Sequence, residues 1–272
     1  MPDVFLQWFA QKQWQLRDYQ AHMLGAFTRH ESTLLIAPTG AGKTLSGFLP
    51  TLVDLHEQPI TGLHTLYISP LKALTHDIER NLTQPIEQMG LDITVETRTG
   101  DTPAHKRARQ RKKPPNILLT TPESLMLMLS YVDAKNMFKH LRSVIIDEVH
   151  NLAPNKRGDF TSLALARLQS IQPDFIRFGL SATVAEPALL ANWLGVSGEP
   201  AQVHLCPSVT KPQVQLLPTK AHIPFGGHMA TYAIDDIYTQ VVNAQTALVF
   251  VNTRAQAELI FQGLWEVNDQ NL

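Results

Sequence analysis

A short segment, residues 37–44, has the residue types needed to hold a phosphorylated ligand; it reads Ala-Pro-Thr-Gly-Ala-Gly-Lys-Thr. It follows an apolar run at 33–37 that is typical of a buried strand, and a helical pattern follows it. Backbone N–H groups of such a turn and of the helix N-terminus converge on phosphate oxygens. The predicted loop comprises Thr39, Gly40, Ala41, Gly42, Lys43 and Thr44.

Each polar group of this loop has a predicted role. We expect Lys43 to lie against the β- and γ-phosphates of a nucleoside triphosphate, and the Thr44 hydroxyl to bind Mg²⁺. At Gly40 and Gly42 a Cβ would block the approach of the backbone or demand an unfavourable φ. The strict pattern has a further glycine where this chain has Ala37. The alternative is an ordinary strand–turn–helix with a surface lysine, which the Gly-x-Gly-Lys-Thr core disfavours.

A second apolar run, at 144–146, ends in Asp147-Glu148-Val149-His150. An acidic residue at the carboxyl end of a strand, in the same sheet as a phosphate loop, is where a second Mg²⁺ contact is required. We therefore assign metal binding to Asp147 and the role of general base toward the attacking water to Glu148. Together with Lys43 they form the predicted catalytic set. Solvated charges that merely end a strand are the alternative.

His150 has a predicted role in coupling. Its place beside the two carboxylates suggests that it links the nucleotide site to Ser181-Ala182-Thr183, which follows the apolar run 176–180. The hydroxyls of Ser181 and Thr183 can bridge between loops. Without that link, His150 is a structural histidine.

Gln20 lies about twenty residues before the phosphate loop, in a segment that is predicted to be helical. A side-chain amide carries both a donor and an acceptor, so Gln20 could bind the edge of an adenine. By itself, a glutamine in a helix is more often a surface residue.

Composition limits the class of protein. The 272 residues are 44% hydrophobic and 17% charged, with a net charge of −1, so the chain can bury a core and any basic surface must be local. A single cysteine, Cys206, excludes a disulfide framework. Neither a signal peptide nor a run long enough to span a bilayer is visible, and we expect a cytoplasmic monomer without membrane contact.

Apolar runs alternate with helical patterns between residues 33 and 205, which predicts an α/β fold with a parallel sheet covered on both faces. Residues 1–30 are predicted to be helical. Strands are predicted over 33–37, 65–69, 93–97, 117–120, 144–147, 176–180 and 202–205, and helices over 43–56, 72–89, 103–112, 122–129, 161–172 and 186–194.

The last part of the chain is predicted to open a second domain. Prolines and glycines at 206–228 indicate a linker between a first domain, 1–205, and residues 229–272. In the latter we expect a helix over 228–243, a strand over 246–251 and a helix over 254–265. These are too few residues to close a core.

These motifs, in this order, resemble superfamily 2 helicases, and more closely the large helicase-related (Lhr) family with its ligase-associated DExH-box members. Further stretches carry the resemblance: Ser69-Pro70-Leu71-Lys72-Ala73-Leu74, Arg98-Thr99-Gly100-Asp101-Thr102-Pro103, Thr121-Pro122-Glu123, Lys156-Arg157-Gly158 and Val249-Phe250-Val251-Asn252-Thr253-Arg254. Ligase-associated members tend to carry tryptophan where this chain has Val149.

The resemblance implies an ATP- and Mg²⁺-dependent motor with two RecA-like domains of the P-loop class. It implies adenine contact by Gln20 and a link from Ser181 and Thr183 to domain movement. Sequence-independent contacts with nucleic-acid phosphates are implied for Pro70, Lys72, Thr99, Gly100, Thr121, Pro122 and Arg254. DNA is preferred over RNA as the partner, with repair proteins such as a DNA ligase or nuclease as further partners. For the basic run 106–113 we favour a solvated helix face over nucleic-acid binding.

The leading hypothesis is therefore the motor portion of a DNA helicase acting in repair. An RNA helicase of the same superfamily is one alternative. The later motifs of the second domain, which supply arginine fingers, do not occur in the 272 residues, so we expect weak hydrolysis from this chain. That expectation favours a further alternative, a nucleotide-gated nucleic-acid-binding module with little turnover.

Overall fold

The computed structural model describes residues 1–38, 40, 42–70, 72–182, 184–206, 213–219, 225 and 229–268, with only the backbone for 72–74 and 76. The chain divides into two compact units, Met1–Val209 and Thr210–Leu272, which are considered separately below. Most of the linker predicted at 206–228 lies outside the described residues.

The first unit is built on a seven-stranded sheet with the order β3-β4-β2-β5-β6-β1-β7, in which every neighbouring pair is parallel. This confirms the predicted α/β class. The strands are β1 (Thr33–Ile36), β2 (Thr65–Ile68), β3 (Val95–Arg98), β4 (Ile117–Thr120), β5 (Ser143–Ile146), β6 (Ile176–Ser181) and β7 (Gln202–Leu205).

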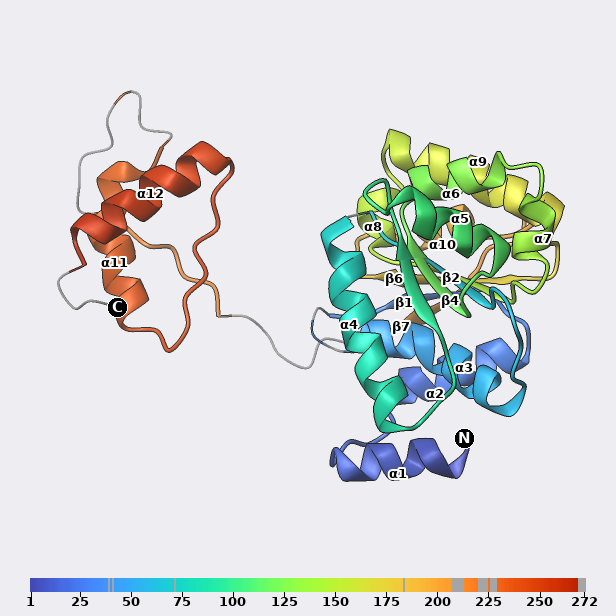
Figure 1. Ribbon diagram of the computed structural model, residues 1–272. Coiled ribbons are helices and arrows are strands. Elements are labelled where there is room, and N and C mark those ends of the chain that lie inside the picture. The colour runs from blue at the N-terminus through green and yellow to red at the C-terminus, as the bar shows by residue number, and fades with distance from the viewer. Residues whose placement is uncertain are drawn as a thin grey trace. The chain divides into compact units, whose positions relative to one another are not determined.

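Alternate residues of β1, β2, β4 and β5 enter two separate cores, because successive side chains of a strand point to opposite faces. In β1, Leu34 and Ile36 join one core and Leu35 joins the other. The core with Leu35 is covered by α1 (Asp3–Gln11), α2 (Asp18–Thr28), α3 (Lys43–Glu57) and α4 (Lys72–Gln88). The core with Leu34 is covered by α6 (Pro122–Leu129), α7 (Ala134–Phe138), α8 (Val149–Leu152), α9 (Lys156–Ile171) and α10 (Pro187–Leu194), as Figure 1 shows.

Several predicted boundaries were wrong. The third strand begins at Val95 rather than at residue 93, and α9 begins at Lys156 rather than at residue 161 because Asn155 caps it. The short helices α7 and α8 were not predicted, since four or five residues are too few for a periodic pattern. Residues 1–30 form two helices with residues 12–17 between them.

The second unit contains a 3₁₀ turn (Thr231–Ala233), α11 (Ile234–Val242) and α12 (Arg254–Glu266). The strand predicted over 246–251 is not formed, so this prediction was wrong. A strand requires a neighbour to pair with, and no other strand occurs among the described residues of this unit. Leu248 and Phe250 are consequently 79% and 88% exposed. Within the described residues of the chain, no helix combines the length and apolar character needed to cross a membrane.

Candidate nucleotide and nucleic-acid sites

The predicted phosphate loop connects the carboxyl end of β1 to the N-terminus of α3. Gly40 and Gly42 adopt φ of +78° and +82°, in the left-handed region that favours glycine. A Cβ built on either residue meets nothing within 4 Å, so backbone conformation rather than crowding selects glycine here. Thr39 and Ala41 lie outside the described residues.

Lys43 is the first residue of α3 and is 8% exposed. Its Nζ donates hydrogen bonds to the carbonyls of Ala37 at 2.9 Å and Pro38 at 3.3 Å, which turns the ammonium group back over the loop. Thr44 follows within the first turn of α3 and is half-buried.

The acidic loop begins where β5 ends, two strands from β1 in the sheet. Asp147 is 6% exposed; its Oδ1 accepts from the Glu148 N–H at 2.9 Å and its Oδ2 accepts from the Tyr67 hydroxyl. Burial and the neighbouring Asp147 raise the pKa of Tyr67 far above its usual range, so the phenol remains a donor. Tyr67 was not predicted to lie at this site; the signal in the sequence is a phenol hydroxyl in the middle of an otherwise apolar strand.

Glu148 adopts φ of +51°, an unusual conformation for a residue with a side chain. Its Oε2 lies 3.2 Å from His150 Nε2 and accepts from Asn151 Nδ2 at 3.3 Å. Oε1 accepts from no donor among the described residues. This arrangement orients the carboxylate while leaving one oxygen able to accept a proton from water.

His150 connects this carboxylate to the end of β6. Its Nδ1 accepts from the Ala182 N–H at 3.3 Å and lies 3.3 Å from Ser181 Oγ. Because Nδ1 accepts a backbone N–H, the proton of neutral His150 is on Nε2, facing Glu148. The structure therefore brings together the three predicted residues Glu148, His150 and Ser181; Thr183 lies outside the described residues.

A cavity of about 690 Å³ lies next to the phosphate loop, and Gln20, Gly40 and Gly42 are among its lining residues. Gln20 is 4% exposed, and its Oε1 accepts from the Arg17 N–H at 3.0 Å, which leaves its amide NH₂ as the group available to a ligand. The remaining lining residues were not predicted to lie there: Phe9, Gln13, Trp14, Gln15, Arg17 and Leu45. Trp14 packs edge-to-face on Trp8, with 5.5 Å between the ring centroids.

The residues predicted to contact nucleic acid follow β2, β3 and β4, three adjacent strands at one edge of the sheet. Pro70 follows β2, Thr99 and Gly100 follow β3, and Thr121 with Pro122 follows β4. The structure therefore places these five residues on neighbouring loops. The side chain of Lys72 lies outside the described part, and Arg254 is the exposed first residue of α12 in the second unit.

The threonine hydroxyls of these loops accept hydrogen bonds from backbone N–H groups a few residues further along the chain. Thr121 and Thr99 are each 3% exposed. Thr121 Oγ1 accepts from the Ser124 N–H at 3.4 Å and so caps α6, and Thr99 Oγ1 accepts from the Asp101 N–H at 3.4 Å. The exposed backbone of Gly100 and the helix N-termini are the better groups for binding phosphate.

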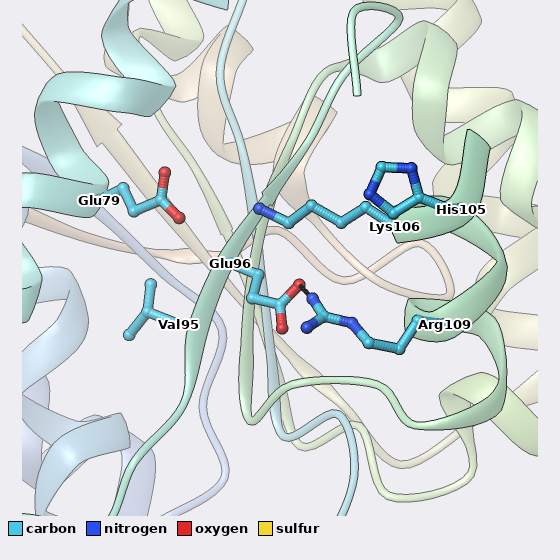
Figure 2. A pocket seen from close by; sticks show the side chains of 6 residues that line it. All are labelled: Glu79, Val95, Glu96, His105, Lys106 and Arg109. Carbon is cyan, nitrogen blue, oxygen red and sulfur yellow. Dashed lines mark hydrogen bonds and ion pairs between the residues drawn. The ribbon is translucent and has the colours of Figure 1, made fainter. Parts of the chain in front are cut away.

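The basic run forms α5 (Ala104–Lys112), beside edge strand β3. Arg109 pairs with Glu96 and Arg111 with Asp133, at 2.5 and 2.6 Å. Figure 2 shows Lys106 and Arg109 extending from α5 over a cavity of about 410 Å³, with Glu79 of α4 on its far side. Two arginines of the basic run thus form ion pairs within the protein. This agrees with the prediction of a solvated helix face, but it does not test whether the run binds nucleic acid.

Comparison with known proteins gives the family. The model of the DEAD/DEAH box helicase family matches residues 17–190. "Lhr helicase/ probable uracil glycosylase" of Mycolicibacterium smegmatis is 38% identical over 268 residues, 92% of this chain and 18% of that protein. "ATP-dependent helicase Lhr-Core" of Methanothermobacter thermautotrophicus is 36% identical over 279 residues, 95% of this chain and 32% of that protein.

Solved structures agree with this assignment. The Mycobacterium smegmatis helicase Lhr bound to ssDNA and AMP-PNP has a TM-score of 0.78 at 35% identity, over 99% of this chain and 36% of that chain. The DUF1998 helicase MrfA has a TM-score of 0.83 at 25% identity, over 100% of this chain and 41% of that chain. The chain thus spans less than a third of the two curated relatives, and it belongs to the DEAD/DEAH box helicase family, with Lhr-type helicases as its relatives.

Proposed function

We propose that this chain is the ATP-binding motor portion of an ATP-dependent DNA helicase of the Lhr type. The observation that carries the proposal is that Lys43, Asp147, Glu148 and His150 follow the carboxyl ends of β1 and β5, and that His150 contacts both Glu148 and Ser181. ATP would bind with its phosphates on the loop before α3 and its base in the cavity beside Gln20.

The residues present fit a magnesium ion. Thr44 and Asp147 offer the hard oxygen ligands that Mg²⁺ prefers, and such sites use few protein ligands alongside phosphates and water. When bound, the ion would neutralise charge on the phosphates. Tyr67 and the Glu148 N–H hold the Asp147 carboxylate in one orientation. Glu148, held through Oε2, would take the proton of the attacking water.

Nucleic acid would bind across the loops that follow β2, β3 and β4, through backbone contacts without base reading. DNA is favoured because a similar protein, the Lhr helicase of Mycobacterium smegmatis, was solved with single-stranded DNA. The likeness to the RNA-bound helicase Mss116, at 18% identity, concerns the fold alone. A role in repair, ligase or nuclease partners, a monomeric state and a cytoplasmic location stay predictions.

The test is the ATPase rate of the chain without nucleic acid, with single-stranded DNA and with RNA of the same length. We expect stimulation by DNA that exceeds stimulation by RNA. Equal or greater stimulation by RNA would favour the RNA helicase. ATP binding and DNA binding without turnover would favour a nucleotide-gated binding module.

A further inference from the structure

Arg157 makes three side-chain hydrogen bonds to two segments that are distant in the sequence. Its Nε donates to Glu123 Oε1 at 2.8 Å, and one terminal nitrogen donates to Glu123 Oε2 at 3.2 Å. The other terminal nitrogen donates to the Pro70 carbonyl at 2.7 Å. The planar guanidinium thus forms a fork onto one carboxylate and also reaches a backbone carbonyl.

Both partners of Arg157 belong to the proposed nucleic-acid loops. Pro70 lies in the loop after β2, and Glu123 is the second residue of α6, directly after Thr121 and Pro122. β2 and β4 are neighbours in the sheet, so the two loops leave the same edge side by side. The fork therefore fixes the distance between two proposed binding segments.

Arg157 is itself held close to the acidic loop. Asn155 Oδ1 accepts from the Arg157 N–H at 2.9 Å and caps α9. Gly158 approaches the end of α8 so closely that an added Cβ would lie 2.4 Å from the Leu152 carbonyl oxygen. Since α8 begins directly after Glu148, the start of α9 is packed against the helix that follows the proposed general base.

Hydrogen bonds continue this connection to Glu148. Asn155 Nδ2 donates to the Asn151 carbonyl at 2.6 Å, and Asn151 Nδ2 donates to Glu148 Oε2 at 3.3 Å. A series of hydrogen bonds therefore runs from the Glu148 carboxylate through Asn151 and Asn155 to Arg157, and from Arg157 to both loops. The segment Lys156-Arg157-Gly158 therefore connects the acidic loop to the loops after β2 and β4.

The pair of Arg157 and Glu123 is suited to positioning rather than to stability. Their side chains are 41% and 55% exposed, and ion pairs in such places contribute little to folding. Partial burial raises the pKa of Glu123, but hydrogen bonds from Arg157, from its own backbone and from Thr121 outweigh burial and lower it. The carboxylate therefore stays charged and keeps both oxygens for the fork at neutral pH.

We propose that Arg157 is a positioning residue that fixes the spacing of the two nucleic-acid loops and joins them to the acidic loop. This inference rests on the proposed function, because it needs the loops after β2 and β4 to bind nucleic acid. It predicts that loss of the fork weakens DNA binding while ATP binding is unchanged.

The test measures the Kd for a fluorescent single-stranded DNA by anisotropy, and the Kd for a fluorescent ATP analogue, on the whole chain. We expect Arg157→Ala to raise the Kd for DNA by roughly tenfold or more, because a displaced binding loop loses its aligned contacts. The Kd for the ATP analogue should change by less than about twofold, which also shows that the variant is folded. Arg167→Ala removes an exposed arginine from the same helix and is the matched control.

Glu123→Ala separates positioning from direct contact. If Arg157 bound phosphates itself, loss of Glu123 would free it and strengthen DNA binding; the fork predicts weaker binding. Glu87→Ala, an exposed glutamate on α4, corrects for the change in net charge. Arg157→Lys keeps the charge but not the fork, so its Kd for DNA should resemble that of Arg157→Ala. In the double variant Arg157→Ala and Glu123→Ala, the two effects on the Kd for DNA should not add.

Four results would overturn the inference. DNA binding by Arg157→Ala equal to that of Arg167→Ala would show that the fork positions nothing. Tighter binding by Glu123→Ala than by Glu87→Ala, or full binding by Arg157→Lys, would make Arg157 a direct phosphate contact. If the unaltered chain binds the ATP analogue but no DNA, the nucleic-acid part of the proposed function fails first and the inference fails with it.

Discussion

At the scale of single residues, hydrogen bonds to the acidic loop explain why two carboxylates that are adjacent in sequence can differ in role. Asp147 is buried, and each of its oxygens accepts a hydrogen bond, from Glu148 N–H and from Tyr67. Among the described residues, the contacts of the Glu148 carboxylate are all made through Oε2. This difference suits the proposed roles, in which the first carboxylate would be a fixed ligand and the second a base with an oxygen left for water.

The Tyr67 hydroxyl should affect binding of Mg²⁺ at the site, and not binding of the nucleotide by itself. We expect Tyr67→Phe to raise by about tenfold the Mg²⁺ concentration needed for half-maximal binding of an ATP analogue, because a hydrogen bond to a charged group contributes about 1.5–3 kcal/mol. Affinity for the analogue without Mg²⁺ should not change. Tyr131→Phe removes a hydroxyl that accepts from Arg98 instead and serves as the control. An equal Mg²⁺ requirement in all three proteins would contradict this role.

At the scale of elements, helix α1 supplies one wall of the nucleotide cavity and is anchored by its aromatic residues. Phe5 and Trp8 are 0% and 5% exposed, and Trp8 Nε1 donates to Gln88 Oε1 of α4 at 2.9 Å. Trp14, between α1 and α2, is 52% exposed and lines the cavity. Two tryptophans six residues apart therefore lie in different surroundings, one in the core and one at the cavity.

Alanine substitutions should separate these functions. Trp8→Ala should lower the free energy of unfolding by about 3–5 kcal/mol, because it empties a buried site. Trp14→Ala should change it by less than about 1 kcal/mol, yet weaken binding of an ATP analogue by roughly tenfold through lost stacking surface. Urea unfolding and fluorescence titration provide the two measurements. A Trp14→Ala variant with unchanged affinity would show that the base does not reach this wall.

The amino ends of β2 and β5 are joined to α3 by a polar network away from the nucleotide loops. Asp54 Oδ2 lies 2.7 Å from His64 Nε2 and accepts from Arg142 at 2.7 Å. Burial raises the pKa of Asp54, but hydrogen bonds and charge from His64 and Arg142 outweigh burial and lower it below 3.8. Because the folded-state pKa is depressed, the stability that Asp54 contributes is present above the unfolded value and is lost as the pH falls through the folded pKa.

Urea unfolding at several pH values tests this network. Asp54→Asn should be less stable than the unaltered chain at pH 6, and the difference should shrink only as the pH falls below about 3.8. Asp92→Asn, an exposed aspartate, should show no such loss at pH 6. If Asp54→Asn and the unaltered chain had the same free energy of unfolding at pH 6, the ionised carboxylate would not stabilise the fold.

At the scale of the whole molecule, the sequence predicted the parallel sheet and the main loops because long apolar runs and motif residues are local signals. The carboxyl ends of parallel strands meet at one edge, so residues as distant as Lys43 and Glu148 could be placed together. Contacts that depend on register could not be predicted: Arg157 with Pro70, Tyr67 with Asp147, and Trp14 with the cavity. The strand expected over 246–251 failed because its local pattern has no partner strand among the described residues.

In the proposed mechanism, the loops after β1 and β5 form one nucleotide site in which binding and hydrolysis depend on different residues. The most direct measurement is titration of a fluorescent ATP analogue with Mg²⁺, with ATPase activity measured on the same samples, for the unaltered chain, Lys43→Ala and Glu148→Gln. Lys43→Ala should lose binding, because it removes the charge beside the phosphates. Glu148→Gln should bind as the unaltered chain does and show no hydrolysis above background. Equal loss of binding in both variants would make Glu148 a structural residue and would contradict the account.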